Sequence, residues 1–250
     1  MEENKKAEIL KKGPEVHFSL NEELDVWKVS TFLNDPHKRG GMDAHKWLLQ
    51  AHPRLGEIET LQYVAEFYVA NRERLERAAG QISQDWDGYA PKFYGAAAEI
   101  FKDLEWPSGK YVGYVSIGSP FPRFLHDKTF QVPWEPEERA IRVAAHELLH
   151  FLFFEYVRKR YTPQLKNTVE KEMNQLMEGK ISIPLWELSE IFNIVVLSPQ
   201  KFGRGGQTQS ASGYSHLARF APVFEKVWSE VGKNIDDLFT RLESVENKRL

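Results

Sequence analysis

The sequence has no cysteine in its 250 residues. This absence excludes disulfide-stabilised scaffolds, thiolate zinc sites and cysteine nucleophiles, so any metal must be held by histidine and carboxylate side chains. The chain also lacks an uncharged apolar run long enough to span a bilayer, and its first residues, MEENKKAEIL, have no apolar segment typical of a signal peptide. We therefore expect a soluble cytoplasmic protein with no membrane partner.

A large excess of charge of one sign is lacking as well. The chain carries 33 Lys and Arg residues against 36 Asp and Glu residues, which gives a formal net charge of -3. Short basic groups occur at residues 72–77, 158–160 and 201–206, but no nucleic-acid-binding motif accompanies them. We expect these groups to lie on solvated faces, and we expect no nucleic-acid partner.

Apolar residues are frequent enough for a sizeable core, since 42% of the chain is hydrophobic. The first part, residues 1–105, is predicted to be mostly helical. Residues 1–14 are polar and are expected to form a mobile arm, and the alternating run at residues 16–20 predicts a strand. Helices are expected over residues 22–33, 57–79 and 91–102.

The second part, residues 106–250, begins where the composition changes. Residues 111–117 and 128–132 are rich in aromatic and β-branched side chains, which predicts two strands that pair antiparallel. Pro136 and the two acids after it predict the start of a helix that continues to about residue 156. Further helices are expected over residues 165–177, 185–197, 215–231 and 235–242, with a loop over residues 201–213. The prediction is an α+β, mostly helical fold in which a small antiparallel sheet packs on the helix that begins after Pro136.

That helix contains the segment VAAHELLHFL, residues 143–152. Four residues are close to one helical turn, so His146 and His150 project from the same face, and Glu147 lies beside them. The helix is apolar on nearly every other side, and two imidazoles and a carboxylate are costly in such surroundings unless they have a partner. The spacing therefore indicates a zinc ion, with Glu147 as the base next to it.

A catalytic zinc ion takes three protein ligands, so one more must come from elsewhere in the chain. The extended metzincin motif would place glycine at position 153 and histidine at position 156. This sequence has Phe153 and Tyr156, which excludes that family. A more distant carboxylate is the remaining common solution.

Three carboxylates are candidates for the third ligand. Glu187 and Glu190 lie one turn apart in the hydrophobic segment LWELSEIFNIVVL, whereas Glu170 lies in the charged stretch NTVEKEMNQ. A carboxylate inside an apolar helix requires an explanation, which favours the first two. We prefer Glu190 because Ser189 and Asn193 flank it and could orient the site, whereas Glu187 lies near a helix amino terminus, where a negative charge is favoured in any case.

These residues resemble the zincin metallopeptidases, and among them the gluzincins, in which a glutamate on a following helix completes the HExxH site. The order of strand, strand, HExxH helix and glutamate helix over residues 111–197 is similar to that of the small catalytic domains called minigluzincins. The resemblance implies a zincin-like peptidase domain at residues 106–250 and an edge strand that binds a peptide or protein substrate by strand addition. Residues 1–105 match no family that we can name.

The implied activity is zinc-dependent peptide-bond hydrolysis by metal-activated water, with zinc on His146, His150 and Glu190 and with Glu147 as general base. Members of the family often stabilise the oxyanion with a tyrosine or histidine from a later segment. Tyr214 and His216 are the candidates here, and we take His216 as the catalytic residue.

A non-catalytic reading is the main alternative. The chain could keep zinc for stability and bind peptides or a protein partner, or its own terminal segments could block the site. An intact Glu147 argues against the first possibility, because a purely structural zinc site has no use for a base. A site blocked by the amino-terminal arm or the carboxy-terminal helix stays open as an alternative.

Overall fold

The structure is a computed structural model that describes residues 13–34, 44–102, 104–160, 185–206, 217, 221–230 and 234–238. Within these residues the chain forms two compact units. The sheet unit comprises Pro14–Tyr89 and Gly109–Glu147, and the helical unit comprises the described parts of Met1–Gly13, Ala90–Ser108 and Leu148–Leu250. The arm expected at residues 1–14 falls almost entirely outside the described residues, as does the helix expected at residues 165–177.

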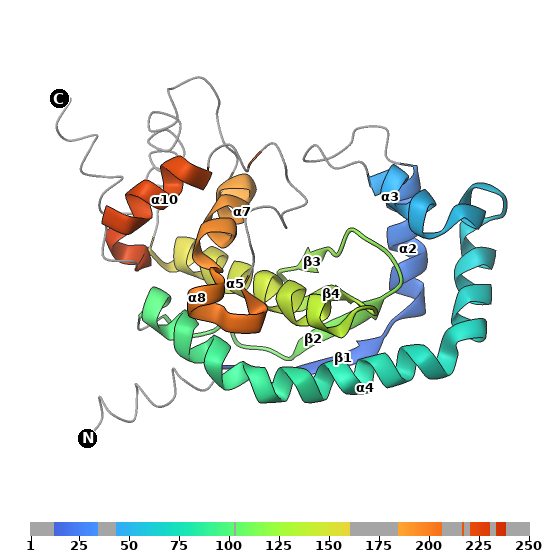
Figure 1. Cartoon of the computed structure of the whole chain (residues 1–250), viewed down its shortest axis with the longest axis horizontal. Coiled ribbons are helices and arrows are strands. Elements are labelled where there is room, and N and C mark those ends of the chain that lie inside the picture. Colours follow the sequence, from blue (N-terminus) through green and yellow to red (C-terminus); the bar gives the residue numbers. More distant parts are fainter. Residues whose placement is uncertain are drawn as a thin grey trace. The chain divides into compact units, whose positions relative to one another are not determined.

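The architecture is α+β and mostly helical, as predicted (Figure 1). Among the described residues, the strands are β1 (Val16–Leu20), β2 (Tyr111–Ser116), β3 (Arg123–Phe124) and β4 (Thr129–Pro133). The helices are α2 (Glu22–Leu33), α3 (Ala44–Ala51), η2 (Pro53–Gly56), α4 (Thr60–Phe101), α5 (Glu137–Arg160), α7 (Leu185–Val196), α8 (Pro199–Phe202), η3 (Gly203–Gly205) and α10 (Ala221–Glu230). None of the described helices is both long and apolar enough to cross a membrane.

The sheet has the strand order β1-β2-β4-β3, and its pairing differs from the prediction. Strands β2 and β4 run parallel, with Gly113 opposite Phe130, and β1 is also parallel to β2. Among the strands that the structure describes, only β3 and β4 are antiparallel. The expected antiparallel pairing of residues 111–117 with residues 128–132 was therefore wrong, because the connection between them forms β3 and this strand takes the antiparallel place beside β4.

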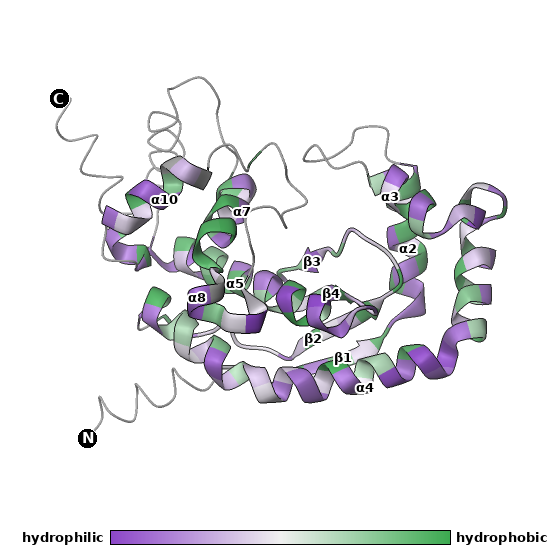
Figure 2. Ribbon diagram, viewed as in Figure 1, coloured by the Kyte–Doolittle hydropathy of each residue, from purple (hydrophilic) through white to green (hydrophobic). Residues whose placement is uncertain are grey.

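Helix α4 is one continuous helix of 42 residues, whereas the sequence predicted two. Pro91 lies inside it, and an interior proline costs about 3 kcal/mol. The buried side chains Ile82, Trp86, Tyr89 and Phe93 continue the helical spacing through the expected break. Each such burial contributes about 1.5–3 kcal/mol, which offsets the cost of the proline. Figure 2 shows the resulting mixture of hydrophobic and hydrophilic residues along α4.

Aromatic rings form the centre of the sheet unit. Phe18 of β1 contacts Phe130 of β4 and Trp86 of α4, with 6.3 Å between ring centroids in both pairs. A Cβ atom at Gly113 of β2 would lie 2.6 Å from the Phe18 ring. Glycine at this position therefore lets the two phenylalanine rings close over the middle of the sheet.

A buried ion pair joins α2 to the sheet. The Nζ atom of Lys28 lies 3.1 Å from Oδ1 of Asp25, and both side chains are almost fully buried. Lys28 also donates to the Ser116 hydroxyl and to the carbonyl oxygen of Gly118. Burial lowers the pKa of Lys28, although the neighbouring Asp25 charge opposes that shift.

The carboxylate of Asp25 collects further donors from three elements. Tyr68 of α4 donates its hydroxyl proton at 2.9 Å, the Gln131 amide of β4 donates at 3.1 Å, and the backbone N–H of Ile117 donates at 3.2 Å. Ser116 donates to the same carboxylate. Asp25 is thus the shared acceptor that fixes α2, α4 and the sheet to one another within the unit.

His52 makes a second buried polar contact in the sheet unit. Its Nε2–H group donates to the carbonyl oxygen of Ile117 at 2.8 Å, so Nδ1 accepts from the Tyr63 hydroxyl at 2.8 Å. Burial lowers the pKa of His52, and the charge of Lys28 acts in the same direction, whereas the Ile117 carbonyl and Asp25 oppose them. The neutral ring is therefore the form that the fold favours.

Acidification is expected to weaken the fold through His52. In the unfolded chain this residue binds a proton with a pKa of about 6.5, whereas its pKa in the folded chain is lower. The free energy of unfolding therefore falls by up to about 1.4 kcal/mol for each pH unit below about 6.5. Urea unfolding between about pH 7.5 and about pH 5.5 measures this loss. The difference in the free energy of unfolding between the wild type and His52→Gln should shrink on acidification. If the free energies of both proteins change in parallel with pH, the loss does not come from His52.

Phe192 of α7 is the centre of the helical unit. Its ring contacts Phe153 of α5 at 5.3 Å and Phe101 of α4 at 5.8 Å between centroids. On α10 it contacts Trp228 at 5.8 Å and Phe224 at 6.4 Å. This packing fixes α7 against α5 and thereby sets the position of any side chain that α7 presents to α5.

Candidate metal centre

Helix α5 carries the HExxH segment and is built as the sequence predicted. Glu137 and Glu138 occupy its first turn, and residues 158–160 supply three basic side chains in its last turn, as the helix dipole favours. His146 is partly buried, whereas His150 has no exposed surface. The neighbouring side chains are mostly buried and apolar: Ala144, Ala145, Leu148, Leu149 and Phe151.

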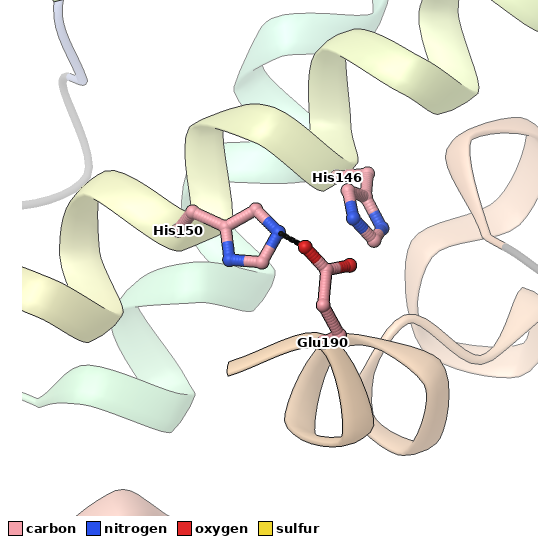
Figure 3. Close-up of side chains that lie close together, drawn as sticks. All are labelled: His146, His150 and Glu190. Carbon is pink, nitrogen blue, oxygen red and sulfur yellow. Dashed lines mark ion pairs between the residues drawn. The ribbon is translucent and has the colours of Figure 1, made fainter. Parts of the chain in front are cut away.

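Helix α7 brings a carboxylate to these two histidines. Every residue from Leu188 to Val196 is buried, and Glu190 has 1% of its surface exposed. One ligand atom from each of His146, His150 and Glu190 lies within 4.8 Å of the others (Figure 3). The Glu190 carboxylate lies between the two imidazole rings, so the three side chains face a common point.

The distance between His150 and Glu190 fits a small divalent cation. Nε2 of His150 lies 3.3 Å from Oε1 of Glu190. A tetrahedral zinc ion with bonds of about 2.0–2.1 Å separates its ligand atoms by about 3.3 Å. A carboxylate that has almost no exposed surface needs a positive partner, and a cation shared by the three side chains provides one. These three residues could therefore hold a metal ion.

The competing carboxylates differ in position. Glu187 lies in the first turn of α7, is partly exposed, and does not belong to the group that faces the histidines. Glu170 lies outside the described residues. Ser189 does not orient Glu190 in the way the sequence suggested, because its hydroxyl donates to the backbone carbonyl of Trp186 at 2.6 Å. Of the described candidates, the structure thus brings only Glu190 to the two histidines.

Glu147 lies beside the metal group and has an ion-pair partner that the sequence did not reveal. Nη1 of Arg123, in β3, lies 3.3 Å from Oε2 of Glu147. Glu147 is buried, and the Arg123 side chain is mostly buried as well. No sequence signal could have identified Arg123, since it lies in a strand of two residues that is not adjacent to the motif.

The residues expected to stabilise an oxyanion cannot be placed. Tyr214 and His216 both lie outside the described residues, and so does most of the loop expected at residues 201–213. The described part of that segment is helical, because α8 and η3 cover Pro199–Gly205. The described site therefore consists of three possible metal ligands, one carboxylate beside them and one arginine that binds this carboxylate.

Comparison with known proteins adds no relative. No family model matches the chain, and neither a curated protein nor a solved structure matches it significantly. The interpretation of the site therefore depends on its own geometry and on the chemistry of its side chains.

Proposed function

We propose that the protein is a zinc-dependent peptidase of the gluzincin type, with a zincin-like catalytic part. One observation carries the proposal: α5 and α7 bring the donor atoms of His146, His150 and Glu190 within 4.8 Å of one another. Two histidines and one glutamate form the ligand set of well-known zinc peptidases, in which water or substrate takes the fourth position. A bound zinc ion supplies positive charge that acidifies a neighbouring water molecule and polarises the carbonyl group of a peptide bond.

The other side chains have defined tasks in this proposal. Glu147 takes a proton from the attacking water, whose oxygen joins the carbonyl carbon, and passes the proton to the leaving nitrogen as the C–N bond breaks. Arg123 positions the Glu147 carboxylate through their ion pair. Strand β3 is the terminal strand of the sheet beyond β4, so an extended peptide can add along it.

Metal content tests the ligand set directly. Glu190→Ala should lower the zinc content of the purified protein from about one ion per chain to near zero, because loss of one of three ligands weakens binding by well over tenfold. Glu187→Ala removes a carboxylate one turn away in the same helix and should leave the content near one. Elemental analysis after dialysis measures both variants. Zinc retained by Glu190→Ala and lost by Glu187→Ala would move the assignment to Glu187.

One observation favours the non-catalytic alternative, a zincin-like module that binds peptides. The carboxylate of Glu147 is already engaged by Arg123, as it would be in a site that does not use a base. Turnover of a peptide library with and without a chelator separates the two readings. Chelator-sensitive cleavage supports the peptidase, whereas zinc-dependent peptide binding without cleavage supports the module.

A further inference from the structure

One face of α5 carries Arg139, Arg142, His146 and His150 in succession. Their separations of three and four residues place them on the same side of the helix. Exposure falls along this row: Arg139 is exposed, Arg142 and His146 are partly buried, and His150 is buried. Solvent therefore reaches this face of α5 at the end that carries the two arginines.

Arg139 and Arg142 place two positive charges close together on α5. The Arg139 guanidinium lies over the Phe121 ring, with Cζ 5.4 Å from the centroid. Partial desolvation of the guanidinium and the nearby charge of Arg142 lower the pKa of Arg139. Glu135, four residues before Arg139, does not neutralise it, because Arg74 binds the Glu135 carboxylate at 2.7 Å. Two neighbouring guanidinium groups of this kind attract an anion.

We propose that Arg139 and Arg142 bind a carboxylate of the substrate, so that the site selects acidic peptides. This inference rests on the proposed peptidase function. Guanidinium groups recognise carboxylates with two parallel hydrogen bonds, which gives orientation as well as affinity. The carboxylate comes either from an Asp or Glu side chain or from the carboxyl terminus of the peptide.

The helix geometry limits where this carboxylate lies in the substrate. A rise of 1.5 Å per residue places Arg142 about 6 Å and Arg139 about 10 Å from His146 along the α5 axis. An extended peptide advances about 3.3 Å per residue. The recognised carboxylate therefore belongs two or three residues from the bond that is cleaved.

The experiment compares peptides that differ in a single charge. The zinc-loaded full chain is given matched pairs with Glu or Gln at each position within about four residues of the cleaved bond, each made with a free or an amidated carboxyl terminus. At one position two or three residues from the cleaved bond, we expect kcat/KM to be at least about tenfold higher for the Glu peptide than for the Gln peptide. Alternatively, we expect the same difference between the free and the amidated carboxyl terminus. The first result shows that the bound carboxylate belongs to a side chain, and the second shows that it is the carboxyl terminus.

Variants link the preference to the arginines. Arg142→Gln should bring the ratio of kcat/KM values between the paired peptides close to one, and Arg139→Gln should reduce it. Arg77→Gln changes the net charge equally, but Arg77 is exposed on α4 and donates to the backbone of Glu73, so this variant should keep the ratio. Cleavage without any preference for acidic peptides, or a preference that survives in Arg142→Gln, overturns the inference.

A binding measurement separates this inference from the proposed function. Fluorescence anisotropy of the same labelled peptides reports affinity whether or not they are cleaved. If no peptide is cleaved but acidic peptides bind at least about tenfold more tightly and lose this advantage in Arg142→Gln, the arginine site stands and the peptidase proposal fails. Equal binding of both members of every pair overturns the arginine site.

Discussion

Replacing Glu147 by glutamine is expected to lower kcat for peptide hydrolysis by about 100- to 10,000-fold while zinc remains bound, since general-base catalysis contributes about this much. Glutamine has nearly the same shape and can still accept a hydrogen bond from Arg123, but it cannot take the proton from water. The three side chains that face the metal position are unchanged in this variant. Steady-state kinetics with a cleaved peptide, together with elemental analysis, measures both effects.

Glu187→Gln is the matched control for this result. It makes the same chemical change at a partly exposed position in the first turn of α7, and its kcat should stay within about twofold of the wild type, as surface substitutions usually have small effects. Full activity of Glu147→Gln with zinc in place would reject Glu147 as the base. Loss of zinc from that variant would instead show that Glu147 contributes to metal binding.

The second large effect is expected in the sheet unit. Asp25→Ala should lower the free energy of unfolding by about 3–5 kcal/mol, because it leaves the buried Lys28 ammonium without its counter-ion. The loss also removes the acceptor that Tyr68 and Gln131 use. A typical domain is stable by only about 5–15 kcal/mol, so a substantial fraction of this variant should unfold in mild urea. Urea titration followed by tryptophan fluorescence and circular dichroism measures the change.

Two further variants show whether loss of the ion pair causes the lower stability of Asp25→Ala. Glu23→Ala removes an exposed carboxylate from the same helix and should change stability by less than about 0.5 kcal/mol. The double variant Asp25→Leu, Lys28→Met removes both charges and should regain part of the stability lost in Asp25→Ala, since a buried pair can be replaced by apolar side chains at little cost. If Asp25→Ala lowers the free energy of unfolding by less than about 1 kcal/mol, the contacts of Asp25 do not hold α2 on the sheet.

The HExxH helix and its glutamate partner were accessible from the sequence for a physical reason. His146, His150 and Glu190 are polar residues in segments that are otherwise apolar, and burial of such residues demands a shared partner. The same argument preferred Glu190 to Glu187; the structure brings the first to the histidines and leaves the second at the partly exposed start of α7.

The features that were missed depend on contacts between distant residues. Strand β3 has two residues, which is too short to show an alternating pattern, so neither the parallel pairing of β2 with β4 nor the position of Arg123 could be inferred. The break expected before Pro91 followed the usual effect of proline on a helix. The continued burial of Trp86 and Phe93 outweighs that effect, and only tertiary packing shows it.

The distribution of the three metal-facing residues over α5 and α7 has a consequence for how these two helices separate on unfolding. A cation bound by all three links α5 to α7 and dissociates when they separate, so ligand binding adds to the work of pulling these helices apart. At a free-ion concentration about 1,000 times the dissociation constant, this linkage amounts to roughly 4 kcal/mol. With a metal ion bound, the packing around Phe192 and the occupancy of the ion site would reinforce each other, and the melting temperature of the protein would report metal availability.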